Sequence, residues 1–349
     1  MSYIRPSFRH PDAETNVNGF TRRDYEGALS TLCAGCGHDS VSSAIIQSCF
    51  EIGIEPHRVA KISGIGCSSK TPTYFLGKSH GFNSVHGRMP SVATGANMAN
   101  RDLLYVGVSG DGDSASIGFG QFGHIARRNL NMIYIVENNG CYGLTKGQDS
   151  ATTDIGSRSK KGEPNTYQAI DLCSIALQLG ATFVARSFSG DKDQLIPLIK
   201  AGMSHNGFAF IDVISPCVTF NNTPASSKGY EFVRDHMEAT GKIDYVPVRS
   251  EITADYASGF NEEITLHDGS VIHLYKDDKL DCTNRSSAMS SIQEYKDKGQ
   301  ILTGLLYVDP DSRDFHETQQ SVKKPLCELV EEDLCPGSRA LAAINASLR

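Results

Sequence analysis

Between about residues 33 and 215, short apolar runs alternate with longer stretches in which apolar residues recur at i, i+3 and i+4. The apolar runs predict β-strands at Arg58–Ser63, Leu103–Ser109, Met132–Glu137, Thr182–Arg186 and Phe208–Ile214. The longer stretches predict helices at Asp39–Glu51, Ser116–Arg127, Tyr167–Leu179 and Asp191–Ser204. Such repeats are typical of an α/β fold, in which helices cover both faces of a doubly wound, mostly parallel sheet.

The loops that follow the predicted strands hold most of the chemically distinctive residues. The loops after Ser63, Ser109, Glu137 and Ile214 are rich in glycine, aspartate, asparagine and cysteine. Ligands of a doubly wound sheet bind outside the carboxyl ends of its strands. We therefore expect the functional site at this edge of the sheet.

The pattern divides the chain into three regions, residues 1–30, 31–225 and 226–349. The first region has no apolar periodicity and predicts an extended N-terminal arm. In the third region, Ile264–Leu266 and Val271–Tyr275 flank Asp268-Gly269, which predicts a β-hairpin. The remainder of that region is polar and weakly periodic, so we expect a C-terminal extension that wraps the core or a partner subunit.

Composition narrows the class of protein. Lys and Arg number 33 against 40 Asp and Glu, so the net charge of −7 argues against binding to nucleic acid or to an acidic membrane surface. No apolar run reaches the roughly 18–20 residues of a membrane span. The polar stretch Met1–Thr21 has no apolar core of a secretory signal, so we expect the cytoplasm. In that reducing compartment, the ten cysteines are expected to serve mainly as metal ligands, redox groups or core residues rather than disulfides.

Two polar loops follow neighbouring predicted strands. Gly110-Asp111-Gly112-Asp113 ends the second strand, and Asn138-Asn139-Gly140-Cys141-Tyr142-Gly143 ends the third. Either loop alone is most simply an ordinary turn. As an ordered pair they supply the carboxylate, carboxamide and carbonyl oxygens that Mg²⁺ prefers, beside a helix N-terminus that favours phosphate. The pair therefore favours a site for a diphosphate and its Mg²⁺, which Asp111 and Asn139 can face together.

A dinucleotide site is the main alternative for the glycine-rich segments. Gly118-Phe119-Gly120-Gln121-Phe122-Gly123 matches the G-x-G-x-x-G string. That motif must follow a strand and open a helix, whereas this copy lies inside a predicted helix. The match is weak and is set aside.

Four of the cysteines lie in three separate loops. Cys33 and Cys36 form a C-x-x-C before the first predicted helix, Cys67 follows the first strand, and Cys217 follows the fifth. Thiolates that converge from separate loops can hold a [4Fe–4S] cluster or a structural zinc ion. Spacing favours the cluster over zinc without excluding zinc.

Several motifs occur together in a characteristic order. They are Cys-Ala-Gly-Cys-Gly-His from Cys33, Gly-Ile-Gly-Cys-Ser-Ser-Lys from Gly64, His86-Gly87-Arg88, Gly-Asp-Gly-Asp from Gly110, and Asn-Asn-Gly-Cys-Tyr-Gly-Leu-Thr-Lys-Gly-Gln from Asn138. In this order the chain resembles the β subunits of 2-oxoacid:ferredoxin oxidoreductases, strongly over residues 24–225. The resemblance implies a sheet of the thiamine-diphosphate-binding type.

The resemblance also implies roles for individual residues. The ligands of one [4Fe–4S] cluster would be Cys33, Cys36, Cys67 and Cys217. Asp111, the Asn139 side chain and the Cys141 carbonyl would bind Mg²⁺. The residues bordering thiamine diphosphate would be Ile65, Gly66, Cys67, Ser68, His86, Gly112, Asp113, Gly143 and Leu144.

Members of this family oxidise a 2-oxoacid with coenzyme A, release CO2 and reduce ferredoxin, or run in reverse to fix CO2. The pyrimidine-binding half of the thiamine site belongs to a separate α subunit, so we expect a heterodimer or a dimer of heterodimers. Lys70 follows the Cys67 loop, and its ammonium could meet the second carboxylate of 2-oxoglutarate. Thr145-Lys146-Gly147-Gln148 also resembles the 2-oxoglutarate members, so succinyl-CoA would be the product.

Other functions remain open at this point. A pyruvate or broad-specificity member of the same family differs only in substrate. A non-redox thiamine-diphosphate enzyme would need no cluster and would normally carry its own pyrimidine domain. A zinc-binding subunit without catalytic activity would use the cysteines structurally.

Overall fold

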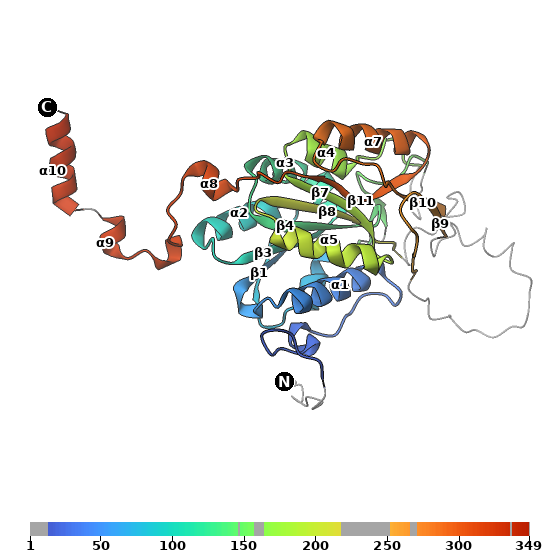
Figure 1. Cartoon of the computed structure of the whole chain (residues 1–349), viewed down its shortest axis with the longest axis horizontal. Helices are drawn as coiled ribbons and strands as arrows, with labels where there is room; N and C mark the ends of the chain where they lie inside the picture. Colours follow the sequence, from blue (N-terminus) through green and yellow to red (C-terminus); the bar gives the residue numbers. More distant parts are fainter. Residues whose placement is uncertain are drawn as a thin grey trace, which may run out of the picture.

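A nine-stranded sheet forms the centre of the molecule (Figure 1). The computed structural model describes residues 13–145, 147–156, 164–217, 252–265, 271–335 and 337–348. The strands are β1 (Val59–Ser63), β2 (His80–Asn83), β3 (Leu104–Gly110), β4 (Met132–Asn138), β7 (Phe183–Phe188), β8 (Phe208–Ile214), β9 (Asn261–Thr265), β10 (Val271–Lys276) and β11 (Ile301–Val308). A small separate ribbon pairs β5 (Cys141–Tyr142) with β6 (Gln148–Asp149).

The sheet is mostly parallel, with the order β2-β1-β3-β4-β8-β7-β11-β10-β9. All neighbours from β2 to β7 pair in parallel. The antiparallel pairs are β11 with β7 and β10 with β9. The prediction of a doubly wound, mostly parallel α/β sheet is therefore confirmed. The parallel order brings the carboxyl ends of β1, β3, β4 and β8 to the same edge.

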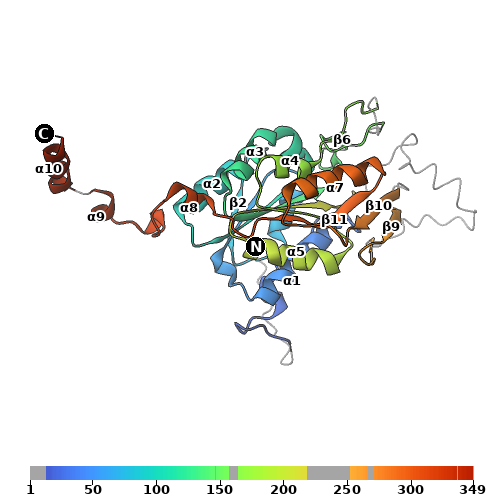
Figure 2. The ribbon, with the colours of Figure 1, turned by 45° about the horizontal axis from the view of Figure 1, so that its top comes forward.

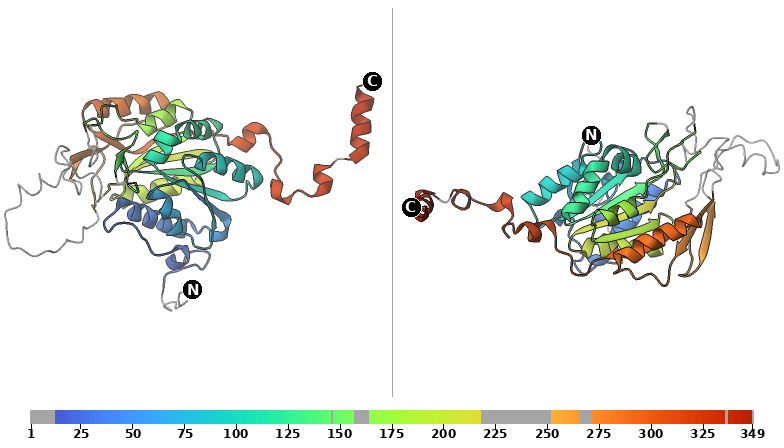
Figure 3. Two further views of the ribbon diagram at one scale, coloured as in Figure 1. Left: turned by 180° about the vertical axis from the view of Figure 1, so that it is seen from behind. Right: turned by 90° about the horizontal axis from the view of Figure 1, so that it is seen from above.

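Helices cover both faces of the sheet (Figures 2 and 3). One face is packed by α1 (Gly37–Ile52) and α5 (Lys192–Ser204), whose apolar residues share a core with one side of the strands. The opposite face is packed by α2 (Met89–Ala99), α3 (Phe119–Arg128), α4 (Leu172–Gln178) and α7 (Arg285–Asp297). The helices that apolar periodicity predicts correspond to α1, α3, α4 and α5, with shifted ends.

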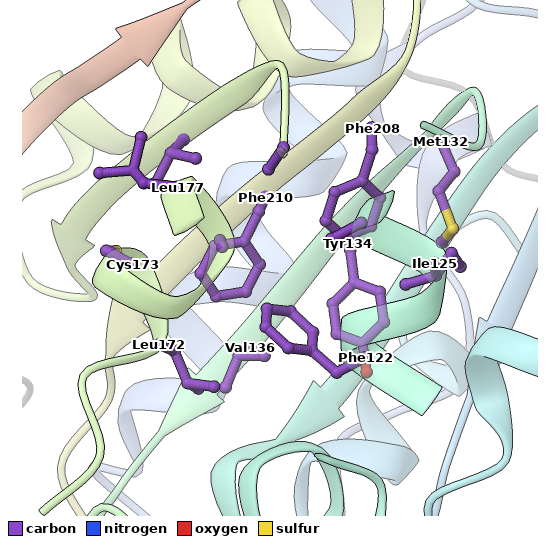
Figure 4. Packing of buried hydrophobic residues seen from close by; sticks show 14 of the residues in the cluster. Phe122, Ile125, Met132, Tyr134, Val136, Leu172, Cys173, Leu177, Phe208 and Phe210 are labelled. Carbon is purple, nitrogen blue, oxygen red and sulfur yellow. The ribbon is translucent and has the colours of Figure 1, made fainter. Parts of the chain in front are cut away.

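Aromatic side chains fill the core on the second face (Figure 4). Phe122 of α3 lies edge-on to Tyr134 of β4 and to Phe208 and Phe210 of β8. The centroids of the Phe122 and Phe210 rings are 5.0 Å apart. Edge-to-face contacts of this kind add to the free energy gained from apolar burial. These contacts fix β4, which precedes the Asn138–Gly143 loop, against α3, which follows the Gly110–Asp113 loop.

Two elements near the site have no clear signal in the sequence. Each of the four residues of β2 is exposed, so this edge strand lacks the apolar run that marks the central strands. The helix α2 is short and contains a glycine and a proline among small residues. Both elements form because they pack beside β1 and α3, not because local periodicity specifies them.

Part of the region beyond residue 225 joins the main sheet. Strands β9 and β10 pair antiparallel, as the predicted hairpin requires, although its Asp268-Gly269 turn lies outside the described residues. Strand β11 then adds to β7, and α7 covers it, so much of the predicted extension is an integral part of the α/β layer. Apolar periodicity did not predict β11, because its apolar run is surrounded by polar sequence.

The two chain ends differ in how they meet this body. Within residues 13–30, Tyr25 is fully buried against Phe20 and Phe50, so this part of the predicted arm packs on α1. After α8 (Phe315–Gln319), the chain leaves the body through α9 (Glu331–Leu334) and α10 (Gly337–Ser347), as Figure 1 shows. No described helix has the length and apolar character needed to cross a membrane.

Candidate active site

A cleft opens at the carboxyl ends of β1, β3 and β4, with about 440 Å³ of space that includes its opening to solvent. The residues that the sequence predicts around a cofactor and its Mg²⁺ line it together: Ile65, Gly66, Cys67, Ser68, His86, Asp111, Gly112, Asp113, Asn139, Cys141, Gly143 and Leu144. His38, Gly110, Tyr142 and Thr145 complete the wall. The sheet topology therefore gathers loops that are far apart in the sequence around one space.

Asp111 is the buried carboxylate at the base of this cleft. It directly follows β3, and its Oδ1 accepts a hydrogen bond from the Asn139 backbone N–H at 3.2 Å. Its Oδ2 accepts hydrogen bonds from the Ser150 hydroxyl and, at 2.7 Å, from the Thr152 hydroxyl. Burial raises the pKa of Asp111, and the two hydroxyls act in the opposite direction. Sequence analysis missed Ser150 and Thr152, because single hydroxyl residues carry no motif.

Asn139 lies beside Asp111, since β4 ends next to β3. Its Oδ1 accepts a hydrogen bond from the Cys141 N–H at 3.1 Å, and its Nδ2 lies 3.4 Å from His38 Nε2. The Cys141 carbonyl accepts from the Gly143 N–H at 3.1 Å. These contacts leave oxygen lone pairs of a carboxylate, a carboxamide and a carbonyl near one another, which is the donor set that suits Mg²⁺.

His38 connects the polar loops to the cysteine loops. Its Nδ1 is 2.6 Å from the Ser215 hydroxyl and 3.6 Å from a Glu137 carboxylate oxygen. Burial lowers the pKa of His38 to about 4, so the ring is neutral at pH 7. A neutral ring can donate from Nδ1 while Nε2 accepts from Asn139. The sequence Cys36-Gly37-His38 signalled this histidine, but its role depends on contacts that only folding creates.

His86 and Asp113 form a carboxylate–histidine pair that also lines the cleft. Asp113 Oδ1 lies 2.6 Å from His86 Nδ1 and accepts from the Gly87 N–H at 2.9 Å, while Oδ2 accepts from the Ser109 hydroxyl at 2.9 Å. The Asp113 side chain is 2% exposed and that of His86 is 40% exposed. Asp113 therefore supports His86 from within the core, and Nε2 of the ring is left for the cleft.

Cys33 and Cys36 are joined by a tight turn. The Cys36 N–H bonds to the Cys33 carbonyl at 3.0 Å, and Gly35 between them has φ of +80°. A turn with this conformation at its third residue favours glycine. Cys36 then precedes the first residue of α1, and burial raises the pKa of its thiol. The turn brings Cys33 and Cys36 to the same side of the chain.

Cys67 and Cys217 approach each other from β1 and β8. A β-carbon added to Gly143 would lie 3.5 Å from Cys67 Sγ, 3.7 Å from Cys217 Sγ and 3.8 Å from Asn139 Nδ2. Gly143 thus leaves open a space between two thiols and the polar loop. Burial and the nearby Cys217 raise the pKa of Cys67. A hydrogen bond with Cys217, together with burial, raises the pKa of the Cys141 thiol.

Within the described ranges, no three His, Cys, Asp or Glu side chains converge on a position for a single metal ion. A [4Fe–4S] cluster is bound by four thiolates distributed over its irons, so it does not need the four sulfurs to meet at one point. The convergence of Cys67 and Cys217 and the turn at Cys33–Cys36 are compatible with such a cluster.

Lys70 and Lys146 are the two lysines that the sequence analysis connected with substrate choice. Lys70 belongs to a short helical turn (Ser68–Thr73), is half-buried, and its positive charge favours the Cys67 thiolate. It does not line the cleft itself. Lys146 of the Thr-Lys-Gly-Gln motif lies outside the described residues. The weak G-x-G-x-x-G string falls largely within α3, as the sequence predicts.

The chain is similar to several known proteins. Residues 64–213 match the family described as thiamine pyrophosphate enzyme, C-terminal TPP binding domain. The solved structure of a 2-oxoglutarate:ferredoxin oxidoreductase from Magnetococcus marinus, with 2-oxoglutarate, coenzyme A and succinyl-CoA bound, is similar with a TM-score of 0.71 and 29% identity. That similarity covers 95% of this chain and 99% of the matched chain.

Two curated relatives show the sequence similarity. The 2-oxoacid:ferredoxin oxidoreductase subunit beta of Sulfolobus sp is 41% identical over 191 residues, which are 54% of this chain and 63% of the relative. The match thus spans less than two thirds of that relative's length. The 2-oxoglutarate synthase subunit KorB of Methanocaldococcus jannaschii is 40% identical over 190 residues, which are 54% of this chain and 70% of the relative. The chain therefore belongs to the family of 2-oxoacid:ferredoxin oxidoreductase β subunits.

Proposed function

We propose that this chain is the β subunit of a 2-oxoglutarate:ferredoxin oxidoreductase, which converts 2-oxoglutarate, coenzyme A and oxidised ferredoxin into succinyl-CoA, CO2 and reduced ferredoxin, or catalyses the reverse. One observation carries the proposal. Gly143 lies next to Cys67 Sγ, Cys217 Sγ and the Asn139 side chain. A redox centre held by these thiols would adjoin the cofactor that Asn139 helps to bind.

The residues present fit both groups. Asp111, Asn139 and the Cys141 carbonyl would hold Mg²⁺ and through it a diphosphate, and Cys33, Cys36, Cys67 and Cys217 would hold one [4Fe–4S] cluster. The space that a β-carbon at Gly143 would fill separates the two sets. When bound, thiamine diphosphate provides the electron sink for decarboxylation, and the cluster accepts electrons singly.

His86 is the titratable side chain best placed to exchange protons with a bound substrate. Asp113 holds its Nδ1 at 2.6 Å, which keeps a proton on that nitrogen and leaves Nε2 directed away from the core. Ile65, Gly66, Ser68, Gly112 and Leu144 line the same cleft and exclude water from part of it. Binding and proton transfer can thus be assigned to residues of this chain.

Residues 64–213 match the C-terminal TPP binding domain of thiamine pyrophosphate enzymes, which supports the assignment of the diphosphate-binding half of the site to this chain. We therefore propose an α subunit that contributes the pyrimidine-binding half, in a heterodimer or a dimer of heterodimers. Ferredoxin would receive electrons from the cluster side. This arrangement predicts that the chain is inactive without its α subunit.

Two observations favour 2-oxoglutarate as substrate. Several relatives, including the KorB subunit of Methanocaldococcus jannaschii, are named for 2-oxoglutarate, as is the Magnetococcus structure. In addition, the positive charge of Lys70 acts on Cys67, which lines the cleft. A charge-assisted hydrogen bond to the second carboxylate would contribute about 1.5–3 kcal/mol.

Replacing Lys70 tests this substrate assignment. Lys70→Ala should lower kcat/KM for 2-oxoglutarate by about ten- to a hundredfold, since one such bond is lost in the transition state. Activity with pyruvate, which lacks the second carboxylate, should change much less. Lys78→Ala, an exposed lysine paired with Asp24, is the matched control and should leave both activities unchanged. Equal losses for both substrates would assign Lys70 to support of the Cys67 loop instead.

A broader 2-oxoacid specificity is the second candidate, because the Sulfolobus relative carries that general name. The experiment that separates the candidates uses the chain purified without oxygen together with its co-purifying subunit. Reduction of ferredoxin should require both 2-oxoglutarate and coenzyme A, and the protein should contain iron and acid-labile sulfide. Higher activity with pyruvate would favour the broader class. Zinc in place of iron, or CO2 release without an electron acceptor, would contradict the redox function.

A further inference from the structure

The turn formed by Ser150-Ala151-Thr152-Thr153 contacts the two loops that carry Asp111 and Gly140. We propose that Ser150 and Thr152 are positioning residues that hold the Asp111 carboxylate in the orientation needed to bind Mg²⁺. This inference rests on the proposed function, in which Asp111 is an Mg²⁺ ligand. The inference adds the hydroxyl groups of Ser150 and Thr152 to the proposed Mg²⁺ site, and neither residue belongs to a motif named in the sequence analysis.

The two hydroxyls both act on the same carboxylate oxygen. Thr152 Oγ1 donates to Asp111 Oδ2 at 2.7 Å, and Ser150 Oγ donates to the same atom. Asp111 Oδ1 accepts only the Asn139 N–H among the hydrogen bonds described, at 3.2 Å. A carboxylate oxygen has two lone-pair directions, so Oδ2 is saturated and Oδ1 keeps one free. The contacts therefore assign metal binding to Oδ1.

The turn itself is fastened to the surrounding loops. The Ser150 N–H donates to Thr153 Oγ1 at 2.7 Å, and Thr153 Oγ1 donates to the Gly140 carbonyl at 2.6 Å. The Ala151 N–H donates to Ser116 Oγ at 3.0 Å, which fixes the turn to the helical segment after Asp111. Because these hydrogen bonds hold the turn in place, the hydroxyls of Ser150 and Thr152 cannot move with the Asp111 carboxylate when that carboxylate rotates.

This arrangement matters because Asp111 is 1% exposed. A buried carboxylate has little water to solvate its charge, so donors from the protein must do so. Two fixed donors on one oxygen also restrict rotation of the carboxylate plane. The oxygen that binds the ion is then directed before the ion arrives, which lowers the cost of binding.

The test compares two variants of Thr152, one that loses the hydroxyl but keeps the side-chain shape and one that keeps the hydroxyl. Thr152→Val removes the donor and preserves the shape, whereas Thr152→Ser preserves the donor. Thiamine diphosphate binding to the full chain with its co-purifying subunit would be measured by calorimetry over a range of Mg²⁺ concentrations. We expect Thr152→Val and Ser150→Ala each to raise the half-saturating Mg²⁺ concentration about tenfold, because each variant loses one hydrogen bond to a charged group. Thr152→Ser should stay within about twofold.

Thr94→Val serves as a control, because its hydroxyl donates to the Pro90 carbonyl and accepts from Arg128, and neither partner belongs to the loops that carry Asp111 and Asn139. Iron content and melting temperature show whether each variant is folded. Unchanged Mg²⁺ dependence in both hydroxyl-loss variants would overturn the inference, as would an equal loss in Thr152→Ser. If Thr152→Val does not fold, Ser150→Ala decides by the same criterion. Absence of Mg²⁺-dependent binding in the unchanged protein would instead overturn the proposed function, and the inference with it.

Discussion

Two groups of proposed ligands are organised in different ways: oxygen groups that line the cleft, and four cysteines of which Cys67 lines it. On the oxygen wall (Asp111, Asp113 and Asn139), side-chain oxygens are already fixed by hydrogen bonds from hydroxyls, backbone N–H groups and His86. On the sulfur wall (Cys33, Cys36, Cys67 and Cys217), order comes mainly from the backbone turn at Cys33–Cys36 and from the ends of β1 and β8. Folding of the chain alone thus prepares the oxygen wall more fully than the sulfur wall.

The difference follows from the chemistry of the ligands. Carboxylate and amide oxygens accept hydrogen bonds strongly, so the protein can hold them in place before a metal binds. Thiols hydrogen-bond weakly, and burial raises the pKa values of Cys36 and Cys67, so both thiols would have to lose a proton to bind the proposed cluster. We expect the sulfur wall to reach its final form only with the cluster, and the two walls to fail separately when they are mutated.

The largest effect should come from the sulfur wall. Cys217→Ser removes one proposed cluster ligand, so iron and acid-labile sulfide should fall well below one cluster per chain and ferredoxin reduction should be lost. Thiamine diphosphate affinity should change less than about threefold, because the oxygen wall keeps its own hydrogen bonds. Anaerobic iron analysis and calorimetry give both values. A full cluster in this variant would remove Cys217 from the ligand set.

A change in the oxygen wall should give the opposite pattern. Asp111→Ala removes the buried carboxylate and should abolish Mg²⁺-dependent binding of thiamine diphosphate, while the visible absorption of the cluster remains. The physical reason is the loss of the one anionic Mg²⁺ ligand proposed in this cleft. Calorimetry and anaerobic absorption spectra would be recorded on the same preparation. Unchanged cofactor affinity, or a bleached cluster, would contradict the separation of the two walls.

Within the oxygen wall, Asp113 should affect catalysis more than binding. Asp113→Asn keeps the shape but removes the charge that supports His86, so kcat should fall about ten- to a hundredfold. The affinity for thiamine diphosphate should stay within about threefold. Ser109→Ala removes a donor to the other oxygen of Asp113 and is the matched control, with an expected loss below about threefold. Parallel losses of kcat and affinity in Asp113→Asn would assign Asp113 to cofactor binding.

The smallest effect concerns stability beneath the sulfur wall. Lys61 of β1 donates to the carbonyls of Phe75 and Leu76 at 2.6 and 3.1 Å, just after the Cys67 loop. Burial lowers the pKa of Lys61 to about 8. Between pH 8 and about 10.4 the unfolded chain binds more protons at this lysine than the folded chain, so the free energy of unfolding should rise with pH.

The rise should be on the order of 1 kcal/mol, because the two carbonyl acceptors of the Lys61 ammonium offset part of the cost of its burial. Urea unfolding of the unchanged protein and of Lys61→Met at pH 8 and pH 10 isolates this contribution. The unchanged protein should gain stability relative to the variant at the higher pH. Parallel stability curves would show that Lys61 titrates alike in both states.

Much of the fold could be predicted because the central strands are buried on both faces. Strand β8 has the bounds that its apolar run predicts, and β4 differs by one residue. The edge strand β2 and the late strand β11 escaped prediction, since one is exposed and the other lies in a polar region. Local periodicity reports burial, so it identifies elements only where burial is continuous.

The candidate site shows the same division. Asp111, Asn139 and the cysteines could be found because each belongs to a short motif after a strand. Thr152, by contrast, is separated from Asp111 by 41 residues and has no motif of its own. Its role is visible only where the turn that follows β6 folds over β3 and β4.

By itself, the sequence determined the kinds of ligand and the loops that carry them, because apolar runs and polar motifs are local properties of the chain. The tertiary structure decided which of these groups meet. Only the neighbour order β1-β3-β4-β8 brings Cys67, Cys217 and Asn139 to Gly143 and sets two hydroxyls on Asp111. Such contacts depend on how distant strands pair, and that pairing is fixed by the packing of the whole core rather than by any one segment.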